Sequence, residues 1–537
     1  MTSTLTPQVT HEADVLVNGL GPVGLMACIL LGRKGYTVHA VERWHKPYGR
    51  PRAVTFDHEI ARILSTIGIE SDDDASIEYH DDHYYWVNKD REILMEVDWI
   101  SKETNGYRNR YWFSQPELED RLRAIVSTLP NVHLHYGREA VEFAQDEDGV
   151  SLVYREIKPD IFTVEFAEDG EIGRIDARYA IGSDGANSFI RQQTGLELTD
   201  LGFDAEWLIV DTKPHVMPSY MTAHFQICDP ARPTTVVPGG PGRRRWEFMS
   251  LPGEDLAELG SEKKVWELLE EWGMTPETAV LERAAVTRFQ GKYLENWRSG
   301  RAMLVGDAAH LMPPFAGEGM CAGLRDVFNL VWRLDLVMTG EAGTHLLDEW
   351  SDERREQAKW YINFSIDLGN VICVTDEAAA AERDARMFAE HAEQSKIGPI
   401  PTHEAVLGEG TWAGDDELAG KTAIQGRVAY RGGTGRFDDA VGRGWYLLSA
   451  VGSEGELSAD RRARLGALGG EQLTVGPEGS GADIVDVEGV YTGWFAEHGI
   501  SHLLTRPDYY VALTAQGHDQ LSERFDRLMR SFEPAAA

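Results

Sequence analysis

Three glycines near the N-terminus have a spacing that can hold the phosphates of a dinucleotide. Gly19, Gly21 and Gly24 form the pattern G-x-G-x-x-G within the segment VLVNGLGPVGLMACILLGRKGYTVHAVER, residues 15–43. In this pattern the first glycine permits a tight turn, the second lets the backbone approach a pyrophosphate, and the third lets a helix pack closely on a sheet. The sequence therefore predicts a dinucleotide site at this turn, and both NAD and FAD fit at this stage.

An acidic residue follows at the distance that ribose recognition requires. Glu42 lies 18 residues beyond Gly24, at the end of the apolar segment TVHAVER. A carboxylate at this position can accept hydrogen bonds from a ribose diol. The alternative is a glycine-rich turn followed by an ordinary surface acid.

The elements around these residues must form a strand, a turn, a helix and a second strand. Residues 13–19 (ADVLVNG) are typical of a buried strand, residues 23–36 have helical periodicity, and residues 37–43 predict a second strand. The N-terminus of the helix then directs its partial positive charge at the phosphates. This order favours the dinucleotide interpretation over an isolated turn.

Two distant segments each place an aspartate after a predicted strand. ARYAIGSDGANSFIRQQTG contains Asp184, and RAMLVGDAAHLMPPFAGEGMCAG contains Asp307 and leads into a long helix that begins near Gly319. An aspartate at the carboxyl end of a strand can bind a ribose or ribityl hydroxyl group, and a helix start can direct N–H groups at an isoalloxazine. Either motif alone would also fit a capped turn between a strand and a helix.

Taken in this order, the three segments resemble those of the class A FAD-dependent aromatic monooxygenases, which have the para-hydroxybenzoate hydroxylase fold. The resemblance covers about residues 12–365 and depends most on GDAAHLMPPFAGEGM. Within this class, QICDPARPTTVVPG, RRRWEFMSLPGE and GDAAHLMPPFAGEGMCAG resemble the 3-(3-hydroxyphenyl)propionate hydroxylases. The resemblance implies that the dinucleotide is FAD and that NADH or NADPH is the co-substrate.

The resemblance also implies which residues contact the cofactor. They comprise the glycine turn, the ribose ligand, basic positions near the pyrophosphate, the aspartates after the strands and the residues beside the flavin ring: Gly19, Gly21, Pro22, Gly24, Glu42, Arg43, Arg52, Gln115, Asp184, Asp307, Pro314, Gly319, Met320 and Cys321. Para-hydroxybenzoate hydroxylase, the archetype of this class, has an asparagine at the position of Cys321 and a lysine at the position of Glu318. These differences leave the flavin assignment intact and disfavour the archetype's own substrate.

The implied chemistry is hydroxylation of a phenol through a C4a-hydroperoxyflavin, next to the existing hydroxyl group. The candidate catalytic residues are His310, Pro313 and Asp57. For His310 the alternative is a structural histidine bonded to the backbone. For Asp57 the alternative is the N-terminal cap of a helix. The sequence names no single catalytic base.

The wall of the substrate site is expected in the middle of the chain. YMTAHFQICD and RRRWEFMSLP alternate in the manner of strands. The candidates for contact with an aromatic acid are His224, Gln226, Arg245, Trp246, Phe248 and, as an aromatic lid, Tyr85. An arginine would pair with the substrate's carboxylate. For each of these residues, packing within the sheet is the alternative.

We expect an α/β fold in which a Rossmann-like FAD-binding domain carries an inserted, mostly antiparallel β-sheet domain. The final strands and helices, including LLTRPDYYVAL, resemble a thioredoxin-like domain without C-x-x-C, with a role in packing or in supporting a homodimer. The FAD-binding domain is expected in two parts, residues 12–197, with a substrate-side insertion near 75–112, and residues 291–365. The substrate sheet is expected between them at residues 198–290. A helical region with a linker (366–410) and the C-terminal domain (411–537) follow.

Composition excludes several other function classes. The formal net charge of −36 disfavours nucleic acid and anionic membrane surfaces. The four cysteines, which form no C-x-x-C, suggest neither a metal site nor a redox dithiol, and the chain has no evident signal segment, so we expect a cytoplasmic protein.

Three functions remain open: a hydroxylase that converts 3-(3-hydroxyphenyl)propionate to its 2,3-dihydroxy catechol, a hydroxylase of another phenol or of a polyketide-derived aromatic, and an FAD-binding protein that has lost oxygenation. The retained aspartates Asp184 and Asp307 argue against the third.

Overall fold

The computed structural model describes residues 9–533, except 48, 50, 51, 160–164, 168, 169, 218–223, 403, 404 and 454. The chain forms two compact units. The first comprises Met1–Ser101, Arg108–Val327 and Ala358–His403, and the second comprises Lys102–Tyr107, Phe328–Gln357 and Glu404–Ala537. No helix among the described residues has both the length and the apolar character needed to cross a membrane.

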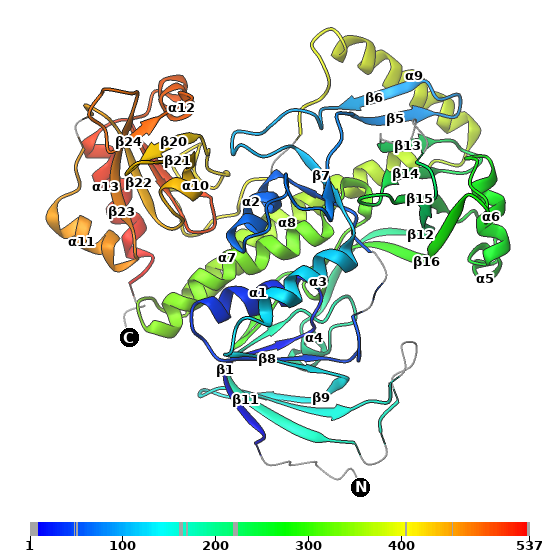
Figure 1. The fold of residues 1–537 in the computed structure, drawn as a ribbon, viewed down its shortest axis with the longest axis horizontal. Coiled ribbons are helices and arrows are strands. Elements are labelled where there is room, and N and C mark those ends of the chain that lie inside the picture. Colours follow the sequence, from blue (N-terminus) through cyan, green and yellow to red (C-terminus); the bar gives the residue numbers. More distant parts are fainter. Residues whose placement is uncertain are drawn as a thin grey trace. The chain divides into compact units, whose positions relative to one another are not determined.

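The first sheet of the first unit, which includes β1, β8 and β11 (Figure 1), contains the strands that precede the three predicted cofactor segments. Strand β1 pairs in parallel with β2 on one side and β11 on the other, and β2–β8 and β11–β18 are also parallel pairs. The carboxyl ends of these strands therefore lie at the same edge. The strands of this sheet are β1 His11–Asn18, β2 Val38–Glu42, β8 Val132–Tyr136, β9 Arg138–Gln145, β10 Val150–Glu156, β11 Ile172–Gly182, β17 Arg298–Ser299 and β18 Ala302–Leu304.

Helix α1 (Pro22–Arg33) begins directly after the glycine turn and packs on β1, β2 and β8. Proline suits the first position of a helix because its missing N–H would have no intrahelical partner there. Nine residues of α1 are buried, and α3 (Gln115–Val126) packs on α1 in turn. These contacts hold the start of α1 at the edge of the sheet where the parallel strands end.

The second sheet of the first unit has two chemically different faces. Leu259 and Val265 pack with Trp246 and other apolar residues on one face, which helices α5 (Leu256–Leu259) and α6 (Glu262–Glu270) cover. The opposite face carries polar side chains, among them Gln226 and Arg245, beside an apolar cluster that includes Trp86 and Trp207. The strands, in spatial order, are β19 His310–Leu311, β16 Ala279–Leu294, β12 Leu198–Pro214, β15 Arg244–Met249, β14 Thr234–Pro238, β13 His224–Cys228, β5 Tyr84–Asn88 and β6 Ile93–Val97.

The segment expected as a substrate-side insertion, near residues 75–112, contributes to two sheets. Strands β5 and β6 extend the second sheet, and β5 pairs in parallel with β13. A separate three-stranded sheet contains β3 Thr55–Asp57, β7 Arg110–Phe113 and β4 Ile77–Glu78, and helix α2 (His58–Thr66) follows β3 directly. Helix α9 (Glu377–Gln394) packs on β6, in the region expected to be helical.

Within the second unit, the described part of residues 404–537 forms a seven-stranded sheet with four helices. The segment LLTRPDYYVAL forms the antiparallel pair β25–β26 around a turn, as expected. The strands in spatial order are β21 Gly433–Arg436, β20 Arg427–Tyr430, β24 Ile484–Asp486, β23 Glu471–Gly476, β22 Tyr446–Ala450, β25 His502–Thr505 and β26 Val511–Ala515; the helices are α10 Phe437–Ala440, α11 Ala459–Ala467, α12 Val490–His498 and α13 His518–Arg530.

The division between the units falls within two long helices, α7 (Gly319–Thr339) and α8 (His345–Ile372). Residues 328–357 belong to the second unit because their apolar side chains are part of its core. Trp332 and Leu346 pack with Trp445 and Leu504 of the C-terminal residues. Helical periodicity alone does not show that one helix serves two cores.

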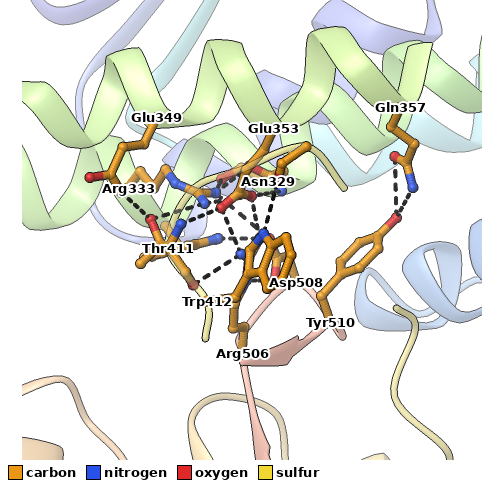
Figure 2. A network of polar contacts seen from close by, with 12 residues as sticks. Asn329, Arg333, Glu349, Glu353, Gln357, Thr411, Trp412, Arg506, Asp508 and Tyr510 are labelled. Atoms are coloured by element: carbon orange, nitrogen blue, oxygen red, sulfur yellow. Dashed lines mark hydrogen bonds and ion pairs between the residues drawn. The ribbon is translucent and has the colours of Figure 1, made fainter. Parts of the chain in front are cut away.

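A buried charge network fixes these helix segments within the second unit (Figure 2). The Glu353 carboxylate accepts hydrogen bonds from Arg506 Nη1 and Nη2, each at 2.9 Å, and from the backbone N–H of Thr411 at 2.6 Å. It also lies 2.7 Å from Arg333 Nη2, and all three charged side chains are fully buried. Burial alone would raise the pKa of Glu353, but the charges of Arg333 and Arg506 lower it to about 2.

We predict that Glu353→Gln destabilises the second unit by about 3 kcal/mol or more, because it leaves the buried guanidinium groups of Arg333 and Arg506 with one carboxylate, Asp508, in place of two. Hydrogen exchange in β22 and β25 measures the effect. The difference from the wild type should shrink as the pH falls from about 4 towards 2, where the wild-type carboxyl group also becomes neutral. Glu349→Gln, one turn earlier on α8, is the matched control because Glu349 accepts a hydrogen bond from Thr411 Oγ1. Equal effects of the two substitutions would contradict the assignment.

Candidate active site

Two adjoining cavities lie where the parallel strands of the first sheet end. The first, of about 260 Å³, is lined by the glycine turn, by the segment around Arg52 and by the polar face of the second sheet. The second is lined by Glu42, Arg43 and Asp184. The cavities share Gly21, Arg52, Ser183, Gly185 and Asp307. Together they form one elongated site within the first unit.

The three glycines of the turn serve different purposes. A Cβ on Gly19, whose φ is +99°, would lie 2.5 Å from the carbonyl oxygen of Ser183, and a Cβ on Gly24 would lie 1.9 Å from the carbonyl oxygen of Gly19. Gly21 has an ordinary φ of −72°, and its Cβ would approach only Arg52 Nη2, at 3.9 Å. Packing within the protein thus requires Gly19 and Gly24. Gly21 leaves open space at the start of α1, which fits the close approach of a pyrophosphate.

Glu42 and Asp184 line the second cavity but also bind the backbone. Glu42 accepts hydrogen bonds from the N–H groups of Leu20, at 2.8 Å, and Trp44, at 3.1 Å. Asp184 accepts hydrogen bonds from the N–H groups of Phe189, at 2.7 Å, and Ile190, at 3.2 Å, from Asn18 Nδ2 at 2.8 Å and from Ser188 Oγ. Glu42 can accept further hydrogen bonds, as a ribose ligand must, whereas the four donors around Asp184 already fill the usual capacity of a carboxylate.

Gln115 and the start of α7 border the first cavity. Gln115 Oε1 accepts hydrogen bonds from the N–H groups of Arg52 and Ala53, at 3.1 and 2.8 Å, and so fixes the segment beside the glycine turn. Pro314, Gly319 and Met320 also line the cavity, as does the exposed Asp307. Cys321 is buried, and Pro313 is buried outside the cavity lining. The residue types present fit a flavin whose ring lies near the N-terminus of α7.

His310 does not line the cavity and acts as a positioning residue. Its Nε2 lies 2.8 Å from Asp326 Oδ2, and both side chains are almost fully buried. The same carboxylate oxygen accepts a hydrogen bond from the N–H of Gly306 at 2.9 Å. The sequence left open a structural histidine bonded to the backbone; the structure instead bonds it to a carboxylate that holds the turn preceding Asp307.

Asp57 is likewise outside the cavity lining. It caps α2 by accepting a hydrogen bond from the N–H of Ile60 at 2.9 Å, and it forms a buried ion pair with Arg325. Burial raises the pKa of Asp57, but the charges of Arg325 and His58 reduce it to a value well below the usual range. Its carboxylate is thus committed to helix α2 and Arg325, and the expected catalytic role has no geometric support.

The buried ion pairs around Arg325 also explain one difference from the archetype. Arg325 Nε donates to Glu59 at 2.6 Å, and its Nη1 donates to Glu318 at 3.0 Å. Arg110 Nη1 donates to the other oxygen of Glu318 at 3.1 Å. Glu318 is the residue before α7, where the archetype has a lysine. Two arginines therefore balance the negative charge of its carboxylate. Sequence reasoning missed this cluster because its members are far apart in the chain.

The polar face of the second sheet contains half of the predicted substrate residues. His224, Gln226 and Arg245 line the cavity. Trp246 and Phe248 instead pack in the apolar core against α5 and α6, and Tyr85 packs against the same core. The prediction for these three is wrong because successive side chains of a strand point to opposite faces. The same alternation could have identified Thr235, Val237 and Glu247, which also line the cavity.

Arg245 is already engaged by protein groups. Its Nε and Nη2 donate to the two carboxylate oxygens of Asp211, at 2.7 and 3.0 Å, and its Nη1 donates to the carbonyl oxygen of Arg52 at 2.6 Å. Burial lowers the pKa of Arg245, but the pairing with Asp211 outweighs burial and raises it. The guanidinium therefore fixes the segment around Arg52 and is not available to bind a substrate carboxylate in the expected bidentate manner.

We predict that Gly21→Ala weakens FAD binding at least 10-fold without destabilising the FAD-free protein, because the added methyl group occupies only the space for the ligand. Titration of the FAD-free protein with FAD, together with its thermal unfolding, measures both effects. Gly466→Ala, in helix α11, is the control because its Cβ would meet no neighbour within 4 Å and Gly466 lies outside the two cavities. Unchanged FAD affinity in Gly21→Ala would contradict the placement of the pyrophosphate.

Comparison with known proteins gives independent information on the family. A family described as "FAD binding domain" matches residues 12–365, and one described as "HcaD C-terminal domain" matches residues 420–530. A probable NADH-specific resorcinol 4-hydroxylase of Rhodococcus jostii is 33% identical over 526 residues, which cover 97% of this chain and 95% of that protein. A 3-(3-hydroxy-phenyl)propionate/3-hydroxycinnamic acid hydroxylase of Klebsiella pneumoniae is 29% identical over 549 residues, which cover 96% and 94%.

Solved structures with the same fold include the flavin-dependent monooxygenase PieE in complex with FAD and substrate. It aligns with a TM-score of 0.77 at 21% identity and covers 97% of this chain and 100% of that one. Aklavinone-11 hydroxylase with FAD and aklavinone aligns with a TM-score of 0.75 at 23% identity and covers 97% and 99%. The family match, the relatives and the site geometry agree: this chain belongs to the class A FAD-dependent aromatic hydroxylases, which use NADH or NADPH as co-substrate.

Proposed function

We propose that this enzyme hydroxylates a monocyclic phenol at the ring carbon next to the existing hydroxyl group. The observation that carries the proposal is His224. Its ring lines the first cavity, its exposed fraction is 7%, and neither ring nitrogen has a hydrogen-bond partner among the described residues. A buried polar group without a partner is costly, so a ligand that supplies one is strongly favoured.

His224 has the properties needed to bind a phenol hydroxyl group. Burial, followed by the positive charges of Arg244 and Arg110, holds its pKa well below the usual value, so the imidazole is neutral at pH 7. A neutral imidazole has one nitrogen that accepts a hydrogen bond. Accepting it from the phenol increases the electron density at the ortho carbon, which is the site that the incoming oxygen attacks.

The surroundings of His224 suit an aromatic ring. The ring centroid of Tyr84 lies 4.3 Å from that of His224, and the ring centroid of Trp99 lies 5.1 Å away. Val54, Val237 and Met312 add apolar surface to the cavity. Such walls exclude water from the reacting atoms. When bound, FAD supplies the redox chemistry by accepting a hydride from NAD(P)H and activating O2 for transfer to the ring.

The substrates named for the relatives favour a single ring over a fused, polyketide-derived substrate. The two relatives are named for resorcinol and for 3-(3-hydroxyphenyl)propionate, which both carry a substituent meta to a hydroxyl group. A meta-substituted phenol of this kind is the substrate class that we propose.

Steady-state assays of the FAD-loaded enzyme with a panel of meta-substituted phenols test the proposed function. A substrate should accelerate NADH or NADPH consumption and yield a product with one added oxygen, ortho to the original hydroxyl group. Equal consumption of the nicotinamide without any aromatic compound, with H2O2 as the only product, would contradict the proposal.

We predict that His224→Phe lowers kcat/KM for the phenol at least 100-fold and diverts reduced flavin towards H2O2, with the FAD content unchanged. His224→Gln, which can still accept a hydrogen bond, should recover part of the loss. In the wild type, kcat/KM should show no ionisation near pH 6.5 from this residue, because its pKa lies well below that value. If His224→Phe and His224→Gln are equally impaired, His224 does not act through a hydrogen bond.

A further inference from the structure

The charges on the cavity face of the second sheet are unfavourable for a substrate carboxylate. Glu247 lines the first cavity, and the exposed fraction of the residue is 5%. Burial raises the pKa of Glu247, whereas the charge of Arg245 lowers it to a smaller extent. The distance from Glu247 Oε1 to Arg245 Nη1 is 3.7 Å. This contact is longer than the two hydrogen bonds that join Arg245 to Asp211.

One guanidinium therefore faces two carboxylates on neighbouring strands. Asp211 on β12 stands opposite Arg245 on β15, and Glu247 follows two residues later on the same face. With both carboxylates ionised, this group of three side chains has a net charge of −1; with Glu247 protonated, the net charge is zero. In neither state does this group carry a net positive charge that could pair with an incoming carboxylate.

The other charged residues of the cavity are at the cofactor end. Among the lining residues that the structure describes, Arg52 is the second cation, and it also lines the cavity that contains Glu42 and Asp184. The remaining described carboxylate of the lining is Asp307, which the two cavities share. Among the described lining residues, charge on the substrate side thus depends on Glu247 and on Arg245, which is paired with Asp211. Arg110 and Arg244 act on His224, and Arg283 acts on Glu247, from outside the cavity lining.

The polar groups that remain on this face are suited to hydroxyl groups. Thr235 Oγ1 donates to Gln226 Oε1 at 2.6 Å, and both residues line the cavity between His224 and Glu247. Thr235 also stands opposite Glu247 in the sheet. A carboxyl group accepts a hydrogen bond from a substrate hydroxyl in either protonation state. A substrate carboxylate beside Glu247 would be desolvated without a compensating charge.

We propose that the substrate is an uncharged phenol whose second substituent is a hydroxyl group, and that Glu247 is the residue that selects against aromatic carboxylates. This inference rests on the proposed function, because it assigns the substrate to the same cavity and places its reacting hydroxyl group at His224. It replaces the phenolic acid expected from the sequence, since the arginine expected to bind the acid is paired with Asp211.

Near-isosteric ligand pairs that differ in charge test the inference. We would compare 3-hydroxybenzyl alcohol with 3-hydroxybenzoate, and 3-(3-hydroxyphenyl)propanol with 3-(3-hydroxyphenyl)propionate, using Kd from flavin absorbance changes and kcat/KM from product formation. The wild-type enzyme should favour the uncharged member of each pair at least 10-fold. A preference for the carboxylates would overturn the inference while leaving phenol hydroxylation intact, whereas no response to any phenol would refute the proposed function itself.

Glu247→Gln assigns the selectivity to one residue. The substitution removes a negative charge while keeping the shape of the side chain, so it should reduce the preference for the uncharged ligands at least 10-fold. Glu206→Gln, on β12 outside the cavity lining, is the matched control and should leave the preference unchanged. A preference that is the same in Glu247→Gln and the wild type would overturn the role of Glu247. If Glu247→Gln loses FAD, the wild-type ligand pairs still decide the substrate class.

Discussion

The close contact between the glycine turn and the end of β11 is the constraint on which the site depends. Gly19 and Gly24 approach each other and Ser183 so closely that a Cβ on either glycine would meet a backbone carbonyl oxygen within 2.5 Å. This packing holds the start of α1 beside the ends of β1 and β11, where Asp184 follows. The parallel pairing of β18 with β11 adds Asp307 to the same edge. Segments that are far apart in the chain thereby form one elongated cavity. Its geometry depends on the close approach of backbone atoms at Gly19, Gly24 and Ser183, and less on the type of any single side chain.

The second sheet and the start of α7 complete the cavity by different means. Strand alternation gives the second sheet an apolar face for its own core and a polar face for the ligand. At α7, the buried pairing of Glu318 with Arg110 and Arg325 holds the residue before the helix start. His310 supports the turn before Asp307 through Asp326. His310 and Asp57, which were candidates for catalysis, are thus bonded within the scaffold, and His224 is the cavity residue that we propose binds the phenol hydroxyl group.

Local patterns predict the elements and the cofactor segments well because these depend on nearby residues. The strand, turn and helix around Gly19, the position of Glu42 at the end of β2 and the antiparallel pair in LLTRPDYYVAL all have strong local signals. Residue type alone places Trp246, Phe248 and Tyr85 in the substrate wall, whereas strand alternation directs them to the apolar core. The pairing of Arg245 with Asp211 depends on the register of β12 and β15, and the Arg325 cluster depends on tertiary contact. Neither leaves a local signal in the sequence.

The central claim is that FAD and a phenol occupy the two ends of one cavity, with His224 at the phenol hydroxyl group. A crystal structure of the FAD-loaded enzyme with a bound phenol tests it most directly. We predict pyrophosphate density against the backbone of Gly21, the flavin ring beside Gly319 and Met320, and the phenol oxygen within hydrogen-bond distance of a His224 nitrogen. A phenol bound on the apolar face of the second sheet, or a flavin that does not contact Gly21, would contradict the account.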